Sequence, residues 1–196
     1  MMQGIILDWG GVLCVDPSPG FISYSSRKLQ IAPERLGPAV RAHLHAFMLG
    51  LPESEFWSRV GAEIGEPLAP GPLWGEALAA VYVEIPETFS IARTLRRGGF
   101  KVGLLTNTEG PSREFHLARG YDFFDARVFS CEEGIAKPDV AIYELMAKRL
   151  KLAPADCLMV DDRPENIAGA RAAGMQVHQF NTTDNLFRAV AKHLRF

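Results

Sequence analysis

Short runs of aliphatic residues alternate with segments of helical periodicity along most of this chain. Continuous aliphatic runs predict strands that are buried on both faces, as in a parallel sheet. The predicted strands are Gly4 to Trp9, Lys101 to Thr106, Arg127 to Ser130, Cys157 to Val160 and Met175 to Phe180. The helices predicted around them are Glu87 to Arg97, Pro138 to Leu150, Glu165 to Ala173 and Thr183 to Leu194. This alternation predicts an α/β fold, a Rossmann-like parallel sheet with helices on both faces.

The alternation is interrupted between the first two strands. Residues 16–84 contain no convincing strand, and prolines and glycines divide them into several pieces. Helical patterns are found at Arg41 to Leu49, Glu53 to Ile64 and Leu73 to Val83. We therefore expect residues 1–15 and 85–196 to form the α/β core, and residues 16–84 to form a small all-helical cap over the strand ends.

Composition adds mainly exclusions. The 196 residues include 21 Lys and Arg against 23 Asp and Glu, and this net charge of −2 gives no sign of a nucleic-acid partner. The N-terminus lacks the basic region of a signal peptide, and no apolar run is long enough for a membrane span, so we expect a cytoplasmic protein without a membrane partner. The three scattered cysteines predict neither a disulfide framework nor a zinc site.

Polar residues stand where four of the predicted strands end. They are Asp8 after the first strand, Thr106 and Asn107 after the second, Lys137 after the third, and Asp161 and Asp162 after the fourth. Taken singly, each has an ordinary explanation, such as a turn cap for an Asp or a solvated side chain for a Lys. Because ligands of open parallel sheets bind at the carboxyl ends of the strands, their joint arrival there predicts a functional site.

The residue types indicate phosphate chemistry. Crowded carboxylates repel one another and favour a cation, and oxygen ligands suit Mg²⁺. A lysine, a threonine hydroxyl and backbone N–H groups suit a phosphoryl group, which Gly10 and Gly11 allow the backbone to approach closely. Asp8 can then attack phosphorus as a nucleophile, forming an aspartyl-phosphate that water later hydrolyses.

The segments that carry these residues resemble the four motifs of the haloacid dehalogenase-like hydrolases. They are Asp8-Trp9-Gly10-Gly11-Val12-Leu13, Leu105-Thr106-Asn107, Lys137-Pro138 and Val160-Asp161-Asp162. The resemblance is closest to the phosphatase branch that carries a helical cap after the first motif. It implies a Mg²⁺-dependent phosphoric monoester hydrolase acting on a small phosphorylated metabolite.

The resemblance also implies a role for each motif residue. The implied catalytic residues are Asp8, Thr106 and Lys137. The implied substrate-binding residues are Gly11, Thr106, Asn107 and Lys137. The implied metal ligands are Asp8, Gly10 through its carbonyl, Asp161 and Asp162. Asn166 takes the place of a further Asp found in many relatives.

Gly10 departs from the pattern that the chain resembles. Most phosphatases of this type carry a second Asp there, which gives a proton to the leaving oxygen. General acid–base help is typically worth about 10²–10⁴ in rate, and glycine cannot provide it. We therefore expect esters with good leaving groups, such as a sugar 1-phosphate, or a proton taken from water or from a cap residue.

Two alternative interpretations remain open. The first is a hydrolase of C–P or C–halogen bonds. Dehalogenases of this superfamily lack the metal site, whereas Asp161 and Asp162 are present here, and the phosphonate-cleaving enzymes that resemble Trp9-Gly10 need a cap lysine, for which Lys28 is the only candidate in residues 16–84. The second is a weakly catalytic protein that binds a phosphorylated ligand, against which the complete set of polar residues argues.

Other residues are weaker candidates for the functional site. Arg41, on the predicted cap, and Glu109, just after the second motif, could face the substrate. Three histidines, His43, His45 and His116, could serve as a substitute acid, but we expect them to be surface or half-buried residues. The aromatic residues of the insertion, Phe47, Phe56, Trp57 and Trp74, are expected to belong to a core.

Overall fold

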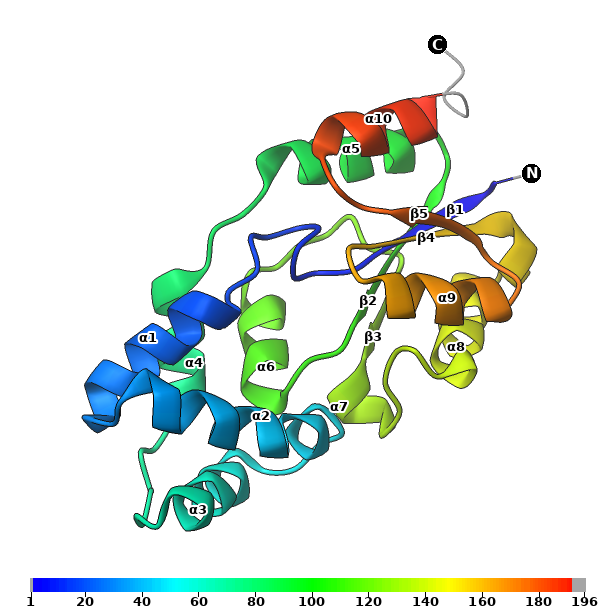
Figure 1. Ribbon diagram of the computed structural model, residues 1–196. Helices are drawn as coiled ribbons and strands as arrows, with labels where there is room; N and C mark the ends of the chain where they lie inside the picture. The colour runs from blue at the N-terminus through cyan, green and yellow to red at the C-terminus, as the bar shows by residue number, and fades with distance from the viewer. Residues whose placement is uncertain (1, 192–196) are drawn as a thin grey trace.

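A five-stranded parallel sheet forms the centre of the molecule, in a computed structural model that describes residues 2–191 (Figure 1). The strands are β1 (Gly4–Leu7), β2 (Lys101–Thr106), β3 (Ala126–Phe129), β4 (Cys157–Asp161) and β5 (Gln176–Gln179), in the order β3-β2-β1-β4-β5. All neighbouring strands are parallel. The predicted α/β fold is confirmed, and the predicted strands agree with the observed ones to within two residues at either end.

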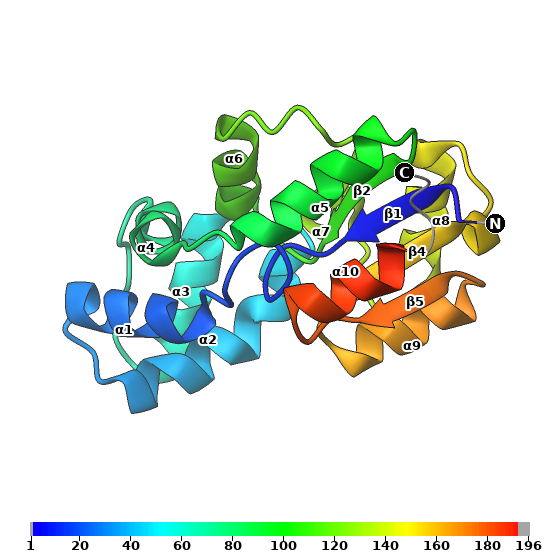
Figure 2. The same ribbon diagram turned by 90° about the horizontal axis from the view of Figure 1, so that it is seen from above.

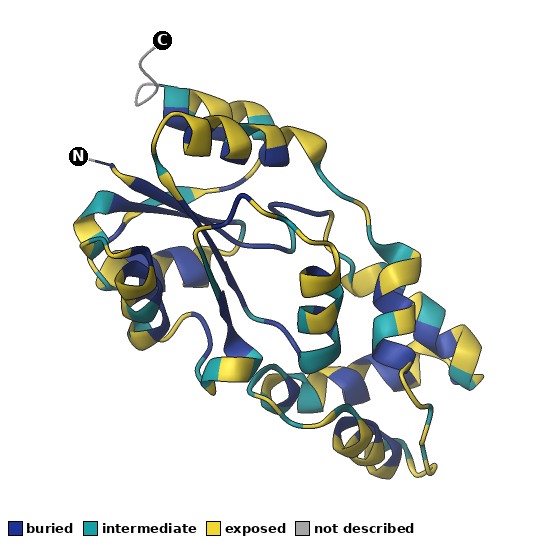
Figure 3. Ribbon diagram, turned by 180° about the vertical axis from the view of Figure 1, so that it is seen from behind, coloured by how far each residue is buried: buried dark blue, intermediate teal, exposed yellow. Residues whose placement is uncertain are grey.

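Helices cover both faces of the sheet, because successive side chains of a strand point to opposite sides. On one face, α5 (Pro86–Arg97) and α10 (Thr183–Ala191) pack over Ile5 and Leu7. On the other face, α8 (Val140–Leu150) and α9 (Pro164–Ala172) pack over Ile6. Figure 3 shows the resulting pattern, with the central strands β1, β2 and β4 largely buried and the outer surfaces of the helices exposed. The end of the last predicted helix, including Leu194, lies outside the described residues.

Four helices follow β1 and lie beyond the carboxyl ends of the strands (Figure 2). They are α1 (Ser18–Leu29), α2 (Pro33–Met48), α3 (Glu53–Ile64) and α4 (Leu73–Val81), which together we call the helical unit. A third core holds them together, and the aromatic residues expected to be core belong to it: Phe47, Phe56, Trp57 and Trp74. The division of the chain into an α/β core and a cap that covers it stays a prediction.

Two helices of this unit differ from the expectation. The prediction missed α1, because only Phe21, Ser25 and Ser26 of this serine-rich helix are buried and no apolar stripe marks it. The second helix begins at Pro33 rather than at Arg41 and contains Pro38. A proline normally interrupts a helix, but here the burial of the surrounding apolar face outweighs one missing hydrogen bond.

The two segments that join the helical unit to the sheet run side by side. The N–H of Val15 donates to the carbonyl of Val83 at 2.9 Å, and the N–H of Ile85 donates to the carbonyl of Leu13 at 2.9 Å. These bonds explain why α4 ends at Val81 instead of at Val83, since the chain must extend to pair with residues 13–15. No helix within residues 2–191 has the length and apolar character to cross a membrane.

Further helices complete the chain. The loop after β2 leads into α6 (Gly110–Ala118), which contacts α4 of the helical unit. A single turn, α7 (Ser130–Glu133), follows β3, and the 3-10 turn η1 (Pro154–Asp156) precedes β4. The segments after β2 and β3 therefore lie on the same side of the sheet as the helical unit, where the predicted functional residues are found.

Candidate active site

The strand register brings two carboxylates to the same level of the sheet. Leu7 pairs with Val160 of the adjacent β4, so that Asp8 and Asp161 occupy the next position on each segment. The N–H of Asp8 still donates to the carbonyl of Val160 at 3.0 Å, and the chain then turns away from the sheet. The acidic residues at the ends of β1 and β4 are therefore placed side by side at one edge of the sheet.

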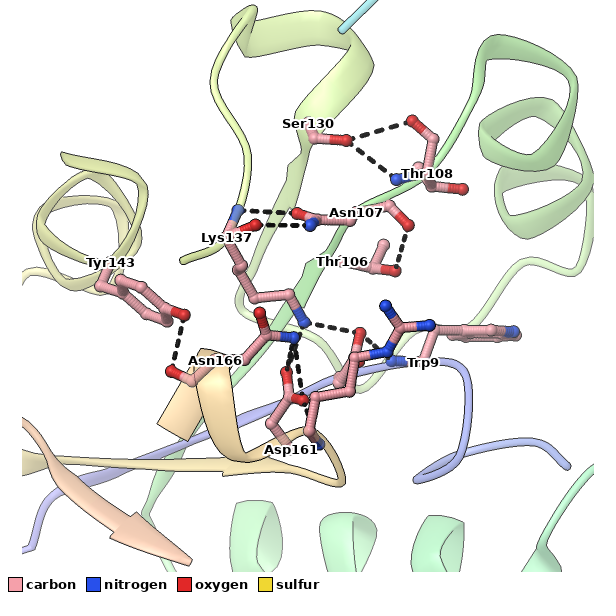
Figure 4. A network of polar contacts seen from close by, with 11 residues as sticks. Trp9, Thr106, Asn107, Thr108, Ser130, Lys137, Tyr143, Asp161 and Asn166 are labelled. Atoms are coloured by element: carbon pink, nitrogen blue, oxygen red, sulfur yellow. Dashed lines mark hydrogen bonds and ion pairs between the residues drawn. The ribbon is translucent and has the colours of Figure 1, made fainter. Parts of the chain in front are cut away.

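Lys137 lies between these carboxylates (Figure 4). Its Nζ is 2.9 Å from Asp8 Oδ1 and 2.6 Å from Asp161 Oδ2, and all three side chains are buried. Burial raises the pKa of Asp8 to about 6, which Lys137 counteracts and Asp161 reinforces. Burial alone would lower the pKa of Lys137, but the two carboxylates outweigh it and raise that pKa. The lysine is therefore held as a buried cation.

Asp161 is fully engaged by its neighbours. Besides Lys137, it accepts hydrogen bonds from the N–H of Arg163 at 2.9 Å and from Asn166 Nδ2 at 3.0 and 3.1 Å. The carbonyl of Asn166 in turn accepts the hydroxyl of Tyr143 at 2.7 Å, as Figure 4 shows. Asp161 is thus positioned to orient Lys137 rather than to reach outward.

Asn107 fixes the backbone of the same lysine. Its Nδ2 donates to the carbonyl of Lys137 at 2.8 Å, and its Oδ1 accepts the N–H of Lys137 at 2.8 Å. The side-chain amide is therefore used inside the protein, whereas no acceptor among residues 2–191 bonds to the backbone N–H of Asn107. Thr106 is buried beside it at the end of β2, so a hydroxyl and an N–H adjoin the lysine.

Three carboxylates are close enough to share a cation. Oxygens of Asp8, Asp161 and Asp162 lie within 4.8 Å of one another. The Oδ1 atom of Asp162 is buried without a hydrogen-bond partner among the described residues, and burial together with Asp161 raises the pKa of this group. Gly11, at φ +77°, packs against the same carboxylate, and a Cβ there would lie 2.6 Å from Asp162 Cγ. This donor set fits an oxygen-seeking divalent cation.

A cleft of about 760 Å³ opens above these groups, between the strand ends and the helical unit. Six of the sequence-predicted residues line it: Asp8, Gly10, Thr106, Asn107, Lys137 and Asp162. The other two, Asp161 and Gly11, are not among its lining residues. The opposite wall comes from the helical unit and is largely apolar, with Phe21, Ile22, Val40, Leu44 and Leu78.

The lining of the cleft divides the weaker candidate site residues into two groups. Arg41 and Glu109 line the cleft, whereas His43 and His45 do not. Lys28 is also absent from the lining residues, and it forms an exposed ion pair with Glu76 at 3.5 Å. The alternative that needs a cleft lysine for a Schiff base therefore has no candidate in the helical unit.

The expectation for His116 was wrong. It was expected at the surface or half-buried, but it is buried in the cleft wall, with its ring centroid 3.9 Å from that of Trp9. Burial lowers the pKa of His116 to about 3, so the imidazole is neutral. The burial of His116 depends on tertiary packing, because α6 turns this residue toward the core. The helical periodicity of one segment could not show which neighbour covers it.

Two serines that the sequence analysis passed over connect the core to the helical unit. Ser130 Oγ donates to the carbonyl of Met48 in α2 at 2.7 Å and accepts the N–H of Thr108 at 2.9 Å. Ser112 Oγ accepts the indole N–H of Trp74 in α4 at 2.8 Å. The spacing of Ser112 and His116 on one helix face was the available signal, but it did not reveal partners so distant in the chain.

Comparison with known proteins identifies the family. The model of the haloacid dehalogenase-like hydrolase family matches residues 2–174. The chain belongs to the haloacid dehalogenase-like hydrolases. In this hydrolase the match includes the ends of β1, β2, β3 and β4, and the resemblance noted from the four motifs is confirmed.

Similar proteins extend this comparison. The hydrolase is 29% identical over 186 residues to sesquiterpene phosphatase astK of Aspergillus oryzae, covering 88% of this chain and 87% of that protein. It is 27% identical over 215 residues to acyl-CoA dehydrogenase family member 10 of mouse, covering 99% of this chain but only 19% of that protein. A family enzyme of Bacteroides thetaiotaomicron, crystallised as an Asp-to-Ala mutant with magnesium and inorganic phosphate, has the same fold. Its TM-score is 0.73 at 18% identity, and the alignment covers 92% of this chain and 95% of that one.

Proposed function

We propose that this hydrolase is a Mg²⁺-dependent phosphatase that cleaves the monoester of a small phosphorylated metabolite through an aspartyl-phosphate on Asp8. The observation that carries the proposal is the pairing of Asp8 with Lys137, 2.9 Å apart, at the floor of a cleft that also exposes Asp162. A carboxylate beside a fixed cation suits attack on an anionic phosphorus centre. Relatives that are named phosphatases and a magnesium–phosphate complex of this fold agree with it.

The protein groups divide the work between attack and binding. Both contacts to Asp8 from the described residues, the N–H of Trp9 at 2.7 Å and Lys137 Nζ, use Oδ1. They leave Oδ2 as the oxygen that attacks phosphorus. Thr106, the N–H of Asn107 and Lys137 bind the phosphoryl oxygens, and Gly11 gives them room. Water then cleaves the aspartyl-phosphate and restores Asp8.

Asp8, the carbonyl of Gly10 and Asp162 are the groups that would hold magnesium. The metal would screen the repulsion between the Asp8 carboxylate and the anionic ester. Asp161 supports the site from behind, since its oxygens already accept from Lys137, Arg163 and Asn166. The buried, unpartnered Oδ1 of Asp162 is the feature of this chain that best fits a cation.

These groups alone suffice for esters whose leaving group needs little protonation. Position 10 carries no side chain, so nothing there can donate a proton to the departing oxygen. Sugar 1-phosphates fit this requirement, because the anomeric oxygen leaves more readily than an ordinary alkoxide. They are therefore the first substrates to test.

The test is phosphate release from a panel of sugar phosphates and other phosphorylated metabolites, with Mg²⁺ or with chelator, for the wild type and Asp8→Asn. Loss of the nucleophile should lower the rate by on the order of 10⁴–10⁶, and chelation should abolish release. Asp184→Asn, which changes an exposed carboxylate on α10, is the matched control. Metal-independent release, or release that survives in Asp8→Asn, would contradict the proposal.

A further inference from the structure

One wall of the cleft is formed by the start of α6 and the residue before it. Glu109, Ser112 and His116 follow one another at helical spacing, and all three line the cleft. Glu109 comes two residues after Asn107, so this wall begins beside the proposed phosphate clamp. At its other end His116 contacts Trp9, the neighbour of the nucleophile. This wall therefore adjoins both the proposed phosphate clamp and the residue next to Asp8.

Glu109 ends a directed chain of hydrogen bonds. The indole Nε1 of Trp74 is 2.8 Å from Ser112 Oγ, which is 2.9 Å from Glu109 Oε2. An indole N–H only donates, so the hydroxyl hydrogen of Ser112 is free to point at Glu109. With Ser112 as the donor Oε2 is an acceptor, and Oε1 is the oxygen left to carry a proton when Glu109 is protonated.

The surroundings of Glu109 favour that protonated form. The residue is 8% exposed, and no lysine or arginine within residues 2–191 forms an ion pair with it. A buried carboxylate without a cation is costly. Burial raises the pKa of Glu109 to about 7, although hydrogen bonds from Ser112, a backbone N–H and Trp74 lower it. A large fraction of the molecules therefore carries this proton at neutral pH.

Other titratable residues also line the cleft outside the proposed phosphate clamp and metal site. They are less suited than Glu109 to donate a proton. Asp16 is exposed, and its carboxylate accepts hydrogen bonds from Ser18. His116 has a pKa of about 3 because it is buried, so it has no acidic proton to give. Arg41 and Arg163 carry guanidinium groups, which bind anions rather than transfer protons. Glu109 thus combines burial, a fixed orientation and an available proton.

We infer that Glu109 is the catalytic acid that protonates the departing alcohol, an inference that rests on the proposed phosphatase function. As the bond from Asp8 to phosphorus forms, the bond from phosphorus to the ester oxygen breaks. That oxygen keeps the electron pair and takes the proton from Glu109, which becomes a carboxylate. In the second step this carboxylate takes a proton from the attacking water, and the bond between phosphorus and Asp8 breaks.

This role extends the substrates to esters of ordinary aliphatic alcohols. An alkoxide is a poor leaving group unless it is protonated, and position 10 cannot supply the proton. The facing wall of the cleft is largely apolar, with Ile22, Val40, Leu44 and Leu78 beside Arg41, and suits an alcohol with an apolar body. The substrate class is therefore phosphate monoesters of largely apolar aliphatic alcohols.

The experiment compares Glu109→Gln with the wild type on p-nitrophenyl phosphate and on n-butyl, n-hexyl and 2-phenylethyl phosphate, all with Mg²⁺. Glutamine keeps the shape of the side chain and its acceptor for Ser112 but has no acidic proton. The measured quantity is kcat/KM, which reports on the steps up to departure of the alcohol. We expect a loss of about 10²–10⁴-fold for the alkyl esters and less than about 10-fold for the nitrophenyl ester.

The control is Glu53→Gln. Glu53 Oε1 accepts the backbone N–H of Trp74 at 2.7 Å, but Glu53 does not line the cleft. If Glu109 only held Trp74 in place, Glu109→Gln would keep its hydrogen-bond acceptor, as Glu53→Gln does, and neither variant would lose activity selectively on the alkyl esters. That result, or a wild type that cleaves the nitrophenyl ester but none of the alkyl esters, would overturn the inference and leave the phosphatase proposal standing. A wild type without Mg²⁺-dependent activity on any ester would overturn both.

Discussion

The carboxyl edge of the sheet and the helical unit are built on different principles. At the edge, polar side chains are buried and each is held by specific partners, as Lys137 is by Asp8, Asp161 and Asn107. In the helical unit, an aromatic core is enclosed by helices whose ion pairs, such as Lys28 with Glu76, are exposed. The edge determines which atoms meet, whereas the helical unit determines the volume and polarity above them.

The largest expected difference between these regions concerns the buried lysine. Lys137→Met leaves Asp8 and Asp161 buried together without their cation, so the free energy of unfolding should fall by about 3–5 kcal/mol. Lys28→Met removes only an exposed pair and should leave the free energy of unfolding nearly unchanged. Urea unfolding without Mg²⁺ measures both values. Equal losses would remove the distinction between the two regions.

The Lys28→Met variant also distinguishes the proposed phosphatase from the phosphonate-cleaving alternative. Lys28→Met should retain the phosphatase activity of the wild type, because Lys28 lies outside the cleft. If it instead abolished cleavage of an aldehyde phosphonate, the Schiff-base interpretation would return.

A second, smaller difference concerns glycine. Gly11→Ala forces a Cβ against the Asp162 carboxylate at a positive φ, and should cost about 1–3 kcal/mol in stability. It should also weaken Mg²⁺ binding, as measured by titration calorimetry. Gly75→Ala, within α4, meets no atom within 4 Å, and should be neutral or stabilising by up to about 1 kcal/mol. Normal Mg²⁺ affinity in Gly11→Ala would show that the backbone there is not held against Asp162.

The smallest expected effect lies at the junction of the two regions. Ser130→Ala removes the buried hydroxyl that joins Met48 to Thr108, and should cost about 1 kcal/mol, with faster hydrogen exchange around residue 48. Ser26→Ala removes a buried hydroxyl that has no partner among the described residues, and should not destabilise the protein. Thermal unfolding and hydrogen exchange compare the two. If Ser130→Ala were no more destabilising than Ser26→Ala, the hydrogen bonds of Ser130 would not help to hold the helical unit to the core.

The same contrast explains what could be predicted from the sequence. Asp8, Lys137 and Asp161 were expected to converge because parallel strands bring their carboxyl ends to one edge, and a short apolar strand followed by a carboxylate is a local signal. The start of α2 was missed because Pro33 and Pro38 argue against a helix there, and α1 was missed because two of its three buried residues are serines. The hydrogen bonds from Trp74 to Ser112 and from Ser112 to Glu109 join α4 to α6, so no local sequence pattern predicts them.

The paired segments around Val15 and Val83 have a broader consequence. Because the chain leaves the sheet and returns to it at a single point, the ends of the intervening helices remain fixed to each other whatever lies between them. The helical unit can therefore be lengthened, shortened or exchanged without altering the separation of β1 and β2. A different helical unit could therefore be grafted between β1 and α5, which would change the wall that faces the proposed substrate and keep the polar residues at the strand ends in place.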